Sequence, residues 1–160
     1  MALVLDGSLG VTFPVTAGSA SAVQASSGRV LQVVYASTGT VTSTTTSTYV
    51  DTALTASITP SSSANKILVT AYCGQVSKSV NDLQMNFQIL RGSTGIFLAS
   101  ALNNNAAAAN ASNPTLVYLD SPATTSSTTY KIQIADRDNV GTVTFNQNGT
   151  ATITLMEIAA

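Results

Sequence analysis

Short runs in which every second residue is apolar recur along most of this chain, and they limit its fold to an all-β architecture. Within 83–90, Leu83, Met85, Phe87 and Ile89 alternate with glutamine and asparagine, which is the pattern of a strand with one buried face. No apolar stripe of helical spacing persists for three turns. From residue 29 onward the strand signals arrive about 8 to 16 residues apart, a spacing typical of an all-β domain.

The strand signals, bounded by turn-forming residues, predict nine short strands around one core. They are Val30–Ala36, Thr48–Thr59, Lys66–Tyr72, Leu83–Leu90, Ile96–Ala99, Thr115–Leu119, Tyr130–Ala135, Thr142–Asn146 and Ala151–Ile158. We expect an antiparallel two-sheet sandwich of jelly-roll type. The nearly continuous apolar run 66–72 predicts a central strand. Asn148 and Gly149 separate the last two runs, which predicts that these runs pair as a hairpin.

The first 28 residues differ in composition from the rest. Thr16–Gly28 is rich in Ala, Ser and Gly and has few side chains able to fill a core, so we predict an extended N-terminal arm over residues 1–28, ahead of a β-sandwich domain over 29–160. The arm's apolar residues are candidate assembly contacts on a partner subunit: Leu3, Val4, Leu5, Val11 and Phe13. The alternative is a first strand pair that packs on its own domain.

Charge is scarce in this chain. Only 8% of the residues are charged and the net charge is −1, whereas soluble domains average about 25% charged residues. The six basic residues are scattered, so neither a nucleic acid nor a membrane surface is an expected partner. Little repulsion would separate copies of this chain, which favours burial of its surface in an assembly over a monomer solubilised by hydroxyls and amides. The start of the sequence has no export-signal pattern, so we expect assembly in a cytoplasm.

Residues able to perform catalysis are few. The chain has no histidine, which removes the commonest general base and metal ligand, and the lone Cys73 is expected to be a small buried hydrophobe. Asp136–Asn139 is the one tight acidic group, and we interpret it as a β-turn rather than a calcium loop. The five tyrosines are expected to be buried in strands. We therefore predict no catalytic, cofactor-binding or metal-binding residues, and no enzyme activity.

One block of the sequence carries a resemblance. Its parts are GRVLQVV at 28–34, a Ser/Thr-rich interval, YVDTALTASITP at 49–60 and NKILVTA at 65–71. This block, with a looser match in the opening MALVLDGS, resembles one found in virion structural proteins of tailed bacteriophages, where it reads GKVLQVV, YxDTGLTxxITP and SKILVxV. The chain departs from that pattern at Arg29, Ala53 and Asn65, where Lys, Gly and Ser are usual.

The resemblance implies a non-enzymatic virion protein assembled in the host cytoplasm. Our first hypothesis is a capsid decoration (cement) protein, a homotrimer whose arm contacts the major capsid protein and stabilises the head. The alternative is a tail-fibre or adhesin component that binds a host surface glycan through a loop at Ser100–Pro114, for which a short helix is the other interpretation. The candidate recognition residues of that loop are Asn103, Asn104, Asn105, Asn110 and Asn113. A head-to-tail connector or tail-tube component is a third possibility.

Overall fold

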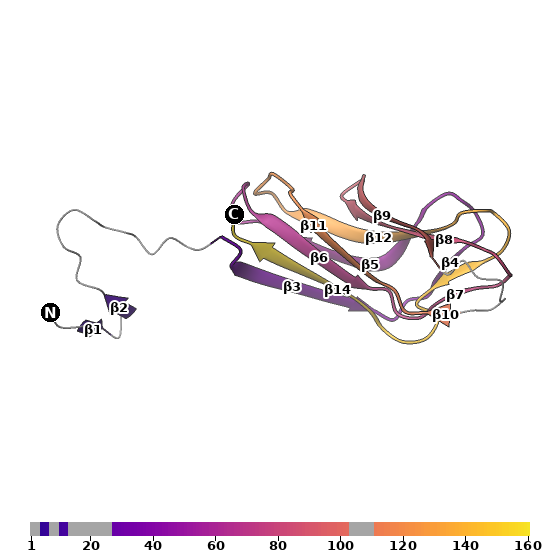
Figure 1. The fold of residues 1–160 in the computed structure, drawn as a ribbon, viewed down its shortest axis with the longest axis horizontal. Coiled ribbons are helices and arrows are strands. Elements are labelled where there is room, and N and C mark those ends of the chain that lie inside the picture. Colours follow the sequence, from indigo (N-terminus) through magenta and orange to yellow (C-terminus); the bar gives the residue numbers. More distant parts are fainter. Residues whose placement is uncertain (1–3, 7–9, 13–26, 103–110) are drawn as a thin grey trace.

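Two four-stranded antiparallel sheets pack face to face in the computed structural model, which describes residues 4–6, 10–12, 27–102 and 111–160 (Figure 1). The first, which we call the β3 sheet, contains in spatial order β11 (Thr115–Asp120), β6 (Lys66–Tyr72), β14 (Ala151–Ile158) and β3 (Val30–Thr38). The second, the β5 sheet, contains β5 (Val50–Ile58), β12 (Thr128–Asp136), β8 (Met85–Arg91) and β9 (Thr94–Leu102). The predicted all-β antiparallel sandwich is confirmed.

The order of the strands is that of a jelly roll. The eight long strands pair from the outside inward: β3 with β14, β5 with β12, β6 with β11, and β8 with β9. The chain therefore passes from one sheet to the other at each connection between long strands except the β8–β9 hairpin. Two four-stranded sheets linked in this way form the double Greek key of jelly-roll domains.

A third, smaller sheet closes one end of the sandwich (Figure 1). It contains β10 (Ala111–Ser112), β7 (Val76–Lys78), β13 (Val143–Phe145) and β4 (Thr42–Thr44), each of which lies in a connection between two long strands. Strands of two or three residues are too short to show a period in the sequence, so three of the four were not predicted.

The predicted hairpin between the last two runs is wrong. β13 pairs with β4 and β7 in the small sheet, whereas β14 pairs with β3 and β6. A two-residue type I′ turn needs a positive φ at both central residues, but of Asn148 and Gly149 only Gly149 has one, at 118°. The turn therefore redirects the chain from one sheet to another.

The core lies between the two long sheets and is built by strict alternation. Every second residue of β5, β12, β6 and β14 is buried, and Phe87, Ile132 and Leu155 are among the side chains that are fully enclosed. Each large apolar side chain buried in this way contributes about 1.5 to 3 kcal/mol. Cys73 is buried as predicted, and burial raises the pKa of its thiol to about 12, so it stays protonated.

The described domain begins close to the predicted boundary. The backbone N–H of Gly28 donates to the carbonyl of Ala159 at 2.8 Å, and that of Ala159 donates to Arg29 at 2.9 Å. Within the predicted arm, β1 (Val4–Asp6) pairs with β2 (Gly10–Thr12) in an antiparallel ladder, and residues 1–3, 7–9 and 13–26 lie outside the described residues. None of the described residues belongs to a helix long and apolar enough to cross a membrane.

Candidate assembly interface

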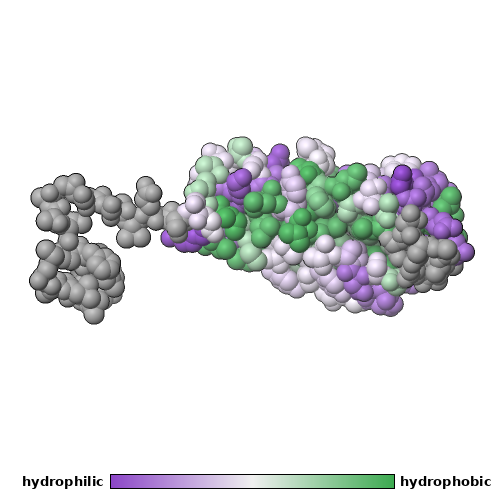
Figure 2. Space-filling view, viewed as in Figure 1, coloured by the Kyte–Doolittle hydropathy of each residue, from purple (hydrophilic) through white to green (hydrophobic). Residues whose placement is uncertain are grey.

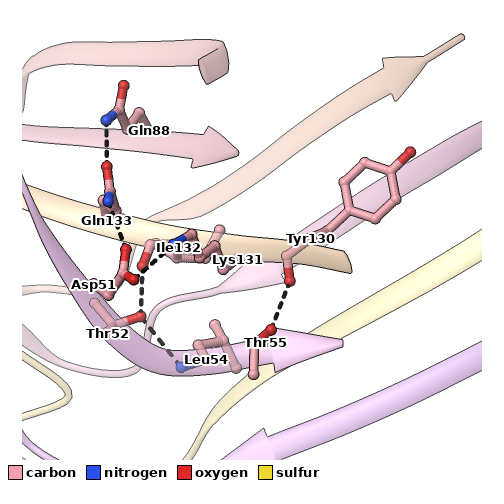
Figure 3. A network of polar contacts seen from close by, with 9 residues as sticks. All are labelled: Asp51, Thr52, Leu54, Thr55, Gln88, Tyr130, Lys131, Ile132 and Gln133. Atoms are coloured by element: carbon pink, nitrogen blue, oxygen red, sulfur yellow. Dashed lines mark hydrogen bonds and ion pairs between the residues drawn. The ribbon is translucent and has the colours of Figure 1, made fainter. Parts of the chain in front are cut away.

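The outer face of the β5 sheet is mainly polar, although Leu98 of β9 is exposed on it opposite Gln88, and its polar side chains bond to one another. Lys131 Nζ lies 2.6 Å from Asp51 Oδ2, and Gln133 donates through Nε2 to Asp51 Oδ1 and accepts from Gln88 (Figure 3). The hydrogen bonds from Lys131 and Gln133 hold the pKa of Asp51 below its usual range. Alternating polar residues that face solvent are what one expects on the uncovered side of an antiparallel sheet.

The outer face of the β3 sheet is built differently. Its register places Leu119 opposite Leu68, Leu68 opposite Met156, and Met156 opposite Val33, so one apolar row crosses all four strands. The next row places Val117 opposite Thr70, Thr70 opposite Thr154, and Thr154 opposite Tyr35. Cross-strand neighbours of this kind lie in contact on the sheet surface.

These side chains are open to solvent. Val33 is 56% exposed, Tyr35 63% and Val117 53%, and hydrophobic surface runs across the face formed by this sheet (Figure 2). Among the outward positions of its four strands, Lys66 is the one charged residue. We call this surface the apolar face: Leu31, Val33, Tyr35, Leu68, Val117, Leu119, Met156 and Ile158. Contiguous exposed apolar surface of this kind marks an interaction site.

The apolar face follows from strands that are apolar on both sides. Residues 30–35 read VLQVVY and 66–72 read KILVTAY, and a two-layer sandwich can cover only one side of each strand. The central-strand prediction for 66–72 is correct, since β6 lies between β11 and β14, but on its outer side Leu68 is half-buried and Tyr72 exposed. The prediction that all tyrosines are buried is wrong for Tyr35 and Tyr72, although Tyr130 is fully buried. Sequence reasoning therefore missed this surface.

A buried carboxylate ties together the end of the sandwich where Gly28 begins the domain. Glu157 Oε1 accepts from the backbone N–H and hydroxyl of Ser61, both at 2.7 Å, and from Asn65 Nδ2 at 2.6 Å. Its Oε2 accepts from Gln32 Nε2 at 2.6 Å. Burial acts to raise the pKa of Glu157, but the hydrogen bonds from Asn65, Gln32 and Ser61 outweigh it and lower the pKa to about 2. The cluster joins β14, β3 and the β5–β6 turn.

Acid should weaken the fold through Glu157. A folded-state pKa of about 2, below the usual 4.5, means that the ionised group stabilises the protein above about pH 4.5, and that this stabilisation is lost as the pH falls toward 2. We expect Glu157→Gln to cost about 1 to 3 kcal/mol at neutral pH, with the difference from wild type narrowing below about pH 4.5. Urea unfolding of both proteins at neutral and acid pH measures this. A difference that stays constant down to about pH 2.5 would contradict it.

The sequence-predicted contact residues fall largely outside the described structure. Leu3 and Phe13 lie outside the described residues, and for Val4, Leu5 and Val11 only the backbone is described, in β1 and β2. The predicted recognition residues Asn103, Asn104, Asn105 and Asn110 also lie outside it. Asn113 is exposed and donates through Nδ2 to the Tyr72 hydroxyl at 3.0 Å.

The predicted loop at 100–114 is wrong at both ends. β9 continues to Leu102 and β10 begins at Ala111. The Ala- and Asn-rich composition hid these strands because neither residue favours a strand by itself, and ladder pairing with β8 and β7 overrides that preference.

The Asp136–Asn139 group is a turn, as predicted. Asp136 is fully buried, and its Oδ2 accepts from the backbone N–H groups of Val140 and Gly141 at 2.8 and 3.0 Å, while Oδ1 accepts from Asp138 at 3.0 Å. Both carboxylate oxygens thus cap backbone amides. Among the described residues, no group of three or more His, Cys, Asp or Glu side chains is placed to hold a metal ion.

A polar groove lies against the small sheet. Its volume is about 550 Å³, and it borders β10 at Ala111, within the predicted recognition segment 100–114. Hydroxyl and amide side chains that line it are Gln75, Ser77, Ser79, Thr142, Thr144, Gln147 and Asn148. Some of them already bond to each other or to nearby backbone, as Asn148 Nδ2 does to Gln75 Oε1 at 2.7 Å.

Comparison with known proteins yields remote structural likeness alone. No family model and no curated protein matches this sequence. Among solved structures, the chain is similar to the subviral particle of infectious bursal disease virus VP2, with 13% identity and a TM-score of 0.45 over 84% of this chain and 39% of that one. It is also similar to the structure of the Gx strain of that virus, with 14% identity and a TM-score of 0.35 over 84% and 37%. The chain spans about two fifths of the length of those proteins.

Proposed function

We propose that this chain is a non-enzymatic structural protein of a virus particle, specifically a tailed-phage decoration protein that binds the head shell and stabilises it. The observation that carries the proposal is the apolar face, since a contiguous apolar surface with Lys66 as its one outward charge is typical of a surface that another molecule covers. Jelly-roll domains are common in viral capsids. The block at 28–71, which resembles phage virion proteins, supplies β3, β5 and β6.

Such a protein would act by contact rather than by chemistry. Many weak apolar and strand-addition contacts, repeated over a symmetric shell, add up through avidity. In this proposal residues 1–28 reach coat subunits, while the sandwich lies over a symmetry axis. The described carboxylates Asp120, Asp136 and Glu157 hold turns and sheets together by hydrogen bonds, so they serve the fold.

The proposal predicts that deleting residues 1–15 abolishes particle binding and leaves the sandwich folded. The fold should survive because the ladder that starts the domain begins at Gly28. Cosedimentation with particles that lack the protein measures binding, and thermal unfolding of the truncated chain is the control. Binding equal to that of the full chain would reject the arm mechanism.

Cryo-electron microscopy of particles should place on the order of hundreds of copies of this protein over the shell. A handful of copies at the tail would reject the head assignment.

A tail-fibre or adhesin component that binds a host glycan is the second candidate, and the polar groove beside Ala111 favours it. Hydroxyl and amide side chains are suited to hydrogen-bond a sugar, although none of the described residues that line the groove has an aromatic ring for stacking. Saturable binding on a glycan array, lost when 103–110, between β9 and β10, is replaced by a Gly/Ser linker, would favour this function. No binding to any glycan on the array would favour the capsid function.

A further inference from the structure

The apolar face needs an occupant, and its chemistry restricts what that occupant can be. The opposite outer face carries Asp51, Lys131 and Gln133 in a hydrogen-bonded polar network. The outer surface of the β3 sheet is therefore mainly apolar, and that of the β5 sheet mainly polar. We propose that the apolar face binds a second copy of this chain, so that the protein is a closed homo-oligomer whose interface is the outer surface of the β3 sheet.

Absence of charge on the face favours a copy of the same chain. A foreign partner recognised by charge would need complementary charges, and the outward positions of β11, β6, β14 and β3 offer only Lys66, at one end of β6. Two copies of a face whose one charge, Lys66, lies at its end meet with little like-charge repulsion, and the net charge of −1 on the chain adds almost none.

Shape and size fit the same occupant. Flat sheet faces stack about 10 Å apart with interdigitated side chains, as the two sheets of this sandwich already do. Four strands of six to nine residues give a flat area of roughly 20 by 25 Å. This is roughly 500 Å², more than half of the roughly 800 Å² that each partner buries in a stable interface, so the apolar face would form the central part of such an interface.

A single apolar face also predicts that the assembly closes. Isologous pairing buries the face against itself, and a ring of a few copies buries it around the axis, while the polar β5 sheet faces outward in both cases. The inference deepens the proposed function, since an oligomer of this kind would be the unit that decorates a shell. The inference is tested by the mass of the isolated protein, whereas the proposed function is tested by binding to particles. Failure of one can therefore be told apart from failure of the other.

Two valines provide a matched test. Val33 on the apolar face and Val140 in the β12–β13 turn are both 56% exposed, so Val33→Glu and Val140→Glu add the same charge at equally open sites. Light scattering after size exclusion gives the mass of each protein at about 1 and 100 µM. We expect a discrete dimer or trimer for wild type and Val140→Glu, and at least a tenfold weaker assembly for Val33→Glu.

A second substitution guards against misfolding. Val33→Thr keeps the β-branched shape and replaces one methyl group with a hydroxyl, so it should stay folded and weaken assembly by less than Val33→Glu. A wild-type monomer at about 100 µM would overturn the proposal and would favour cover by residues 1–28 of the same chain or by a coat protein. An oligomer that survives Val33→Glu unchanged would overturn it too, because the copies would then meet through another surface.

Discussion

Replacing Asp120 with alanine should destabilise the protein by about 3 kcal/mol or more, because this carboxylate joins the two sheets from a buried position. Asp120 ends β11 in the β3 sheet. Its Oδ1 and Oδ2 accept from Arg91 Nη1 at 2.9 and 3.0 Å, and Oδ2 accepts from the Tyr130 hydroxyl at 2.7 Å. Arg91 and Tyr130 both belong to the β5 sheet. Burial and the bond to Asp120 raise the pKa of Tyr130 above its usual range, so its hydroxyl remains a donor that would lose its acceptor.

The chain contains its own control for this prediction. Asp51 also pairs with a basic residue, Lys131 at 2.6 Å, but its side chain is 53% exposed whereas that of Asp120 is 6% exposed. Asp51→Ala should therefore cost no more than about 1 kcal/mol. Urea unfolding measures the free energy of unfolding of both variants, provided that its dependence on urea concentration stays the same as in wild type. Equal losses for the two variants would show that the Asp120 contact does not join the sheets energetically.

Much of the fold could be predicted because alternation is a local signal. The run 66–72 was predicted as a strand with the bounds that β6 has, and 151–158 with those of β14. Each strand has an apolar side that must face a core, so the two-residue period of its sequence agrees with its alternating pattern of buried residues. The small sheet could not be predicted in this way, since β4 and β7 have three residues each and are held by ladder partners far along the chain.

The apolar face was harder to predict, for a different physical reason. The sequence shows that 30–35 and 66–72 are apolar on both sides, but whether the second side meets another layer of the same chain depends on how many layers the fold has. Two layers form here, so the described residues leave the outer side of Val33 and Leu68 without a covering layer. Residues of the candidate site therefore appear only when the strand order is known.

Gly74→Ala should be the most damaging of the glycine substitutions with positive φ, at about 3 to 4 kcal/mol. Gly74 has φ of +65°, and a Cβ there would overlap Asn146 Oδ1 and lie 3.1 Å from its Cγ. Asn146 is buried and its Nδ2 donates to the carbonyl of Thr38 at 3.1 Å, so it cannot move aside without losing that bond.

Gly92 allows the cost of the left-handed backbone to be separated from the cost of the overlap with Asn146. Its φ of +58° is nearly the same as that of Gly74, but no atom lies within 4 Å of where a Cβ would be placed. Gly92→Ala should cost about 1 to 2 kcal/mol, the penalty of the left-handed backbone alone. The excess for Gly74→Ala then measures the overlap with Asn146, which holds the β13–β14 connection to the end of β3. Thermal and urea unfolding of the two variants give this difference. Equal losses would mean that Asn146 yields easily, and that the small-sheet end of the sandwich is packed less tightly than its burial indicates.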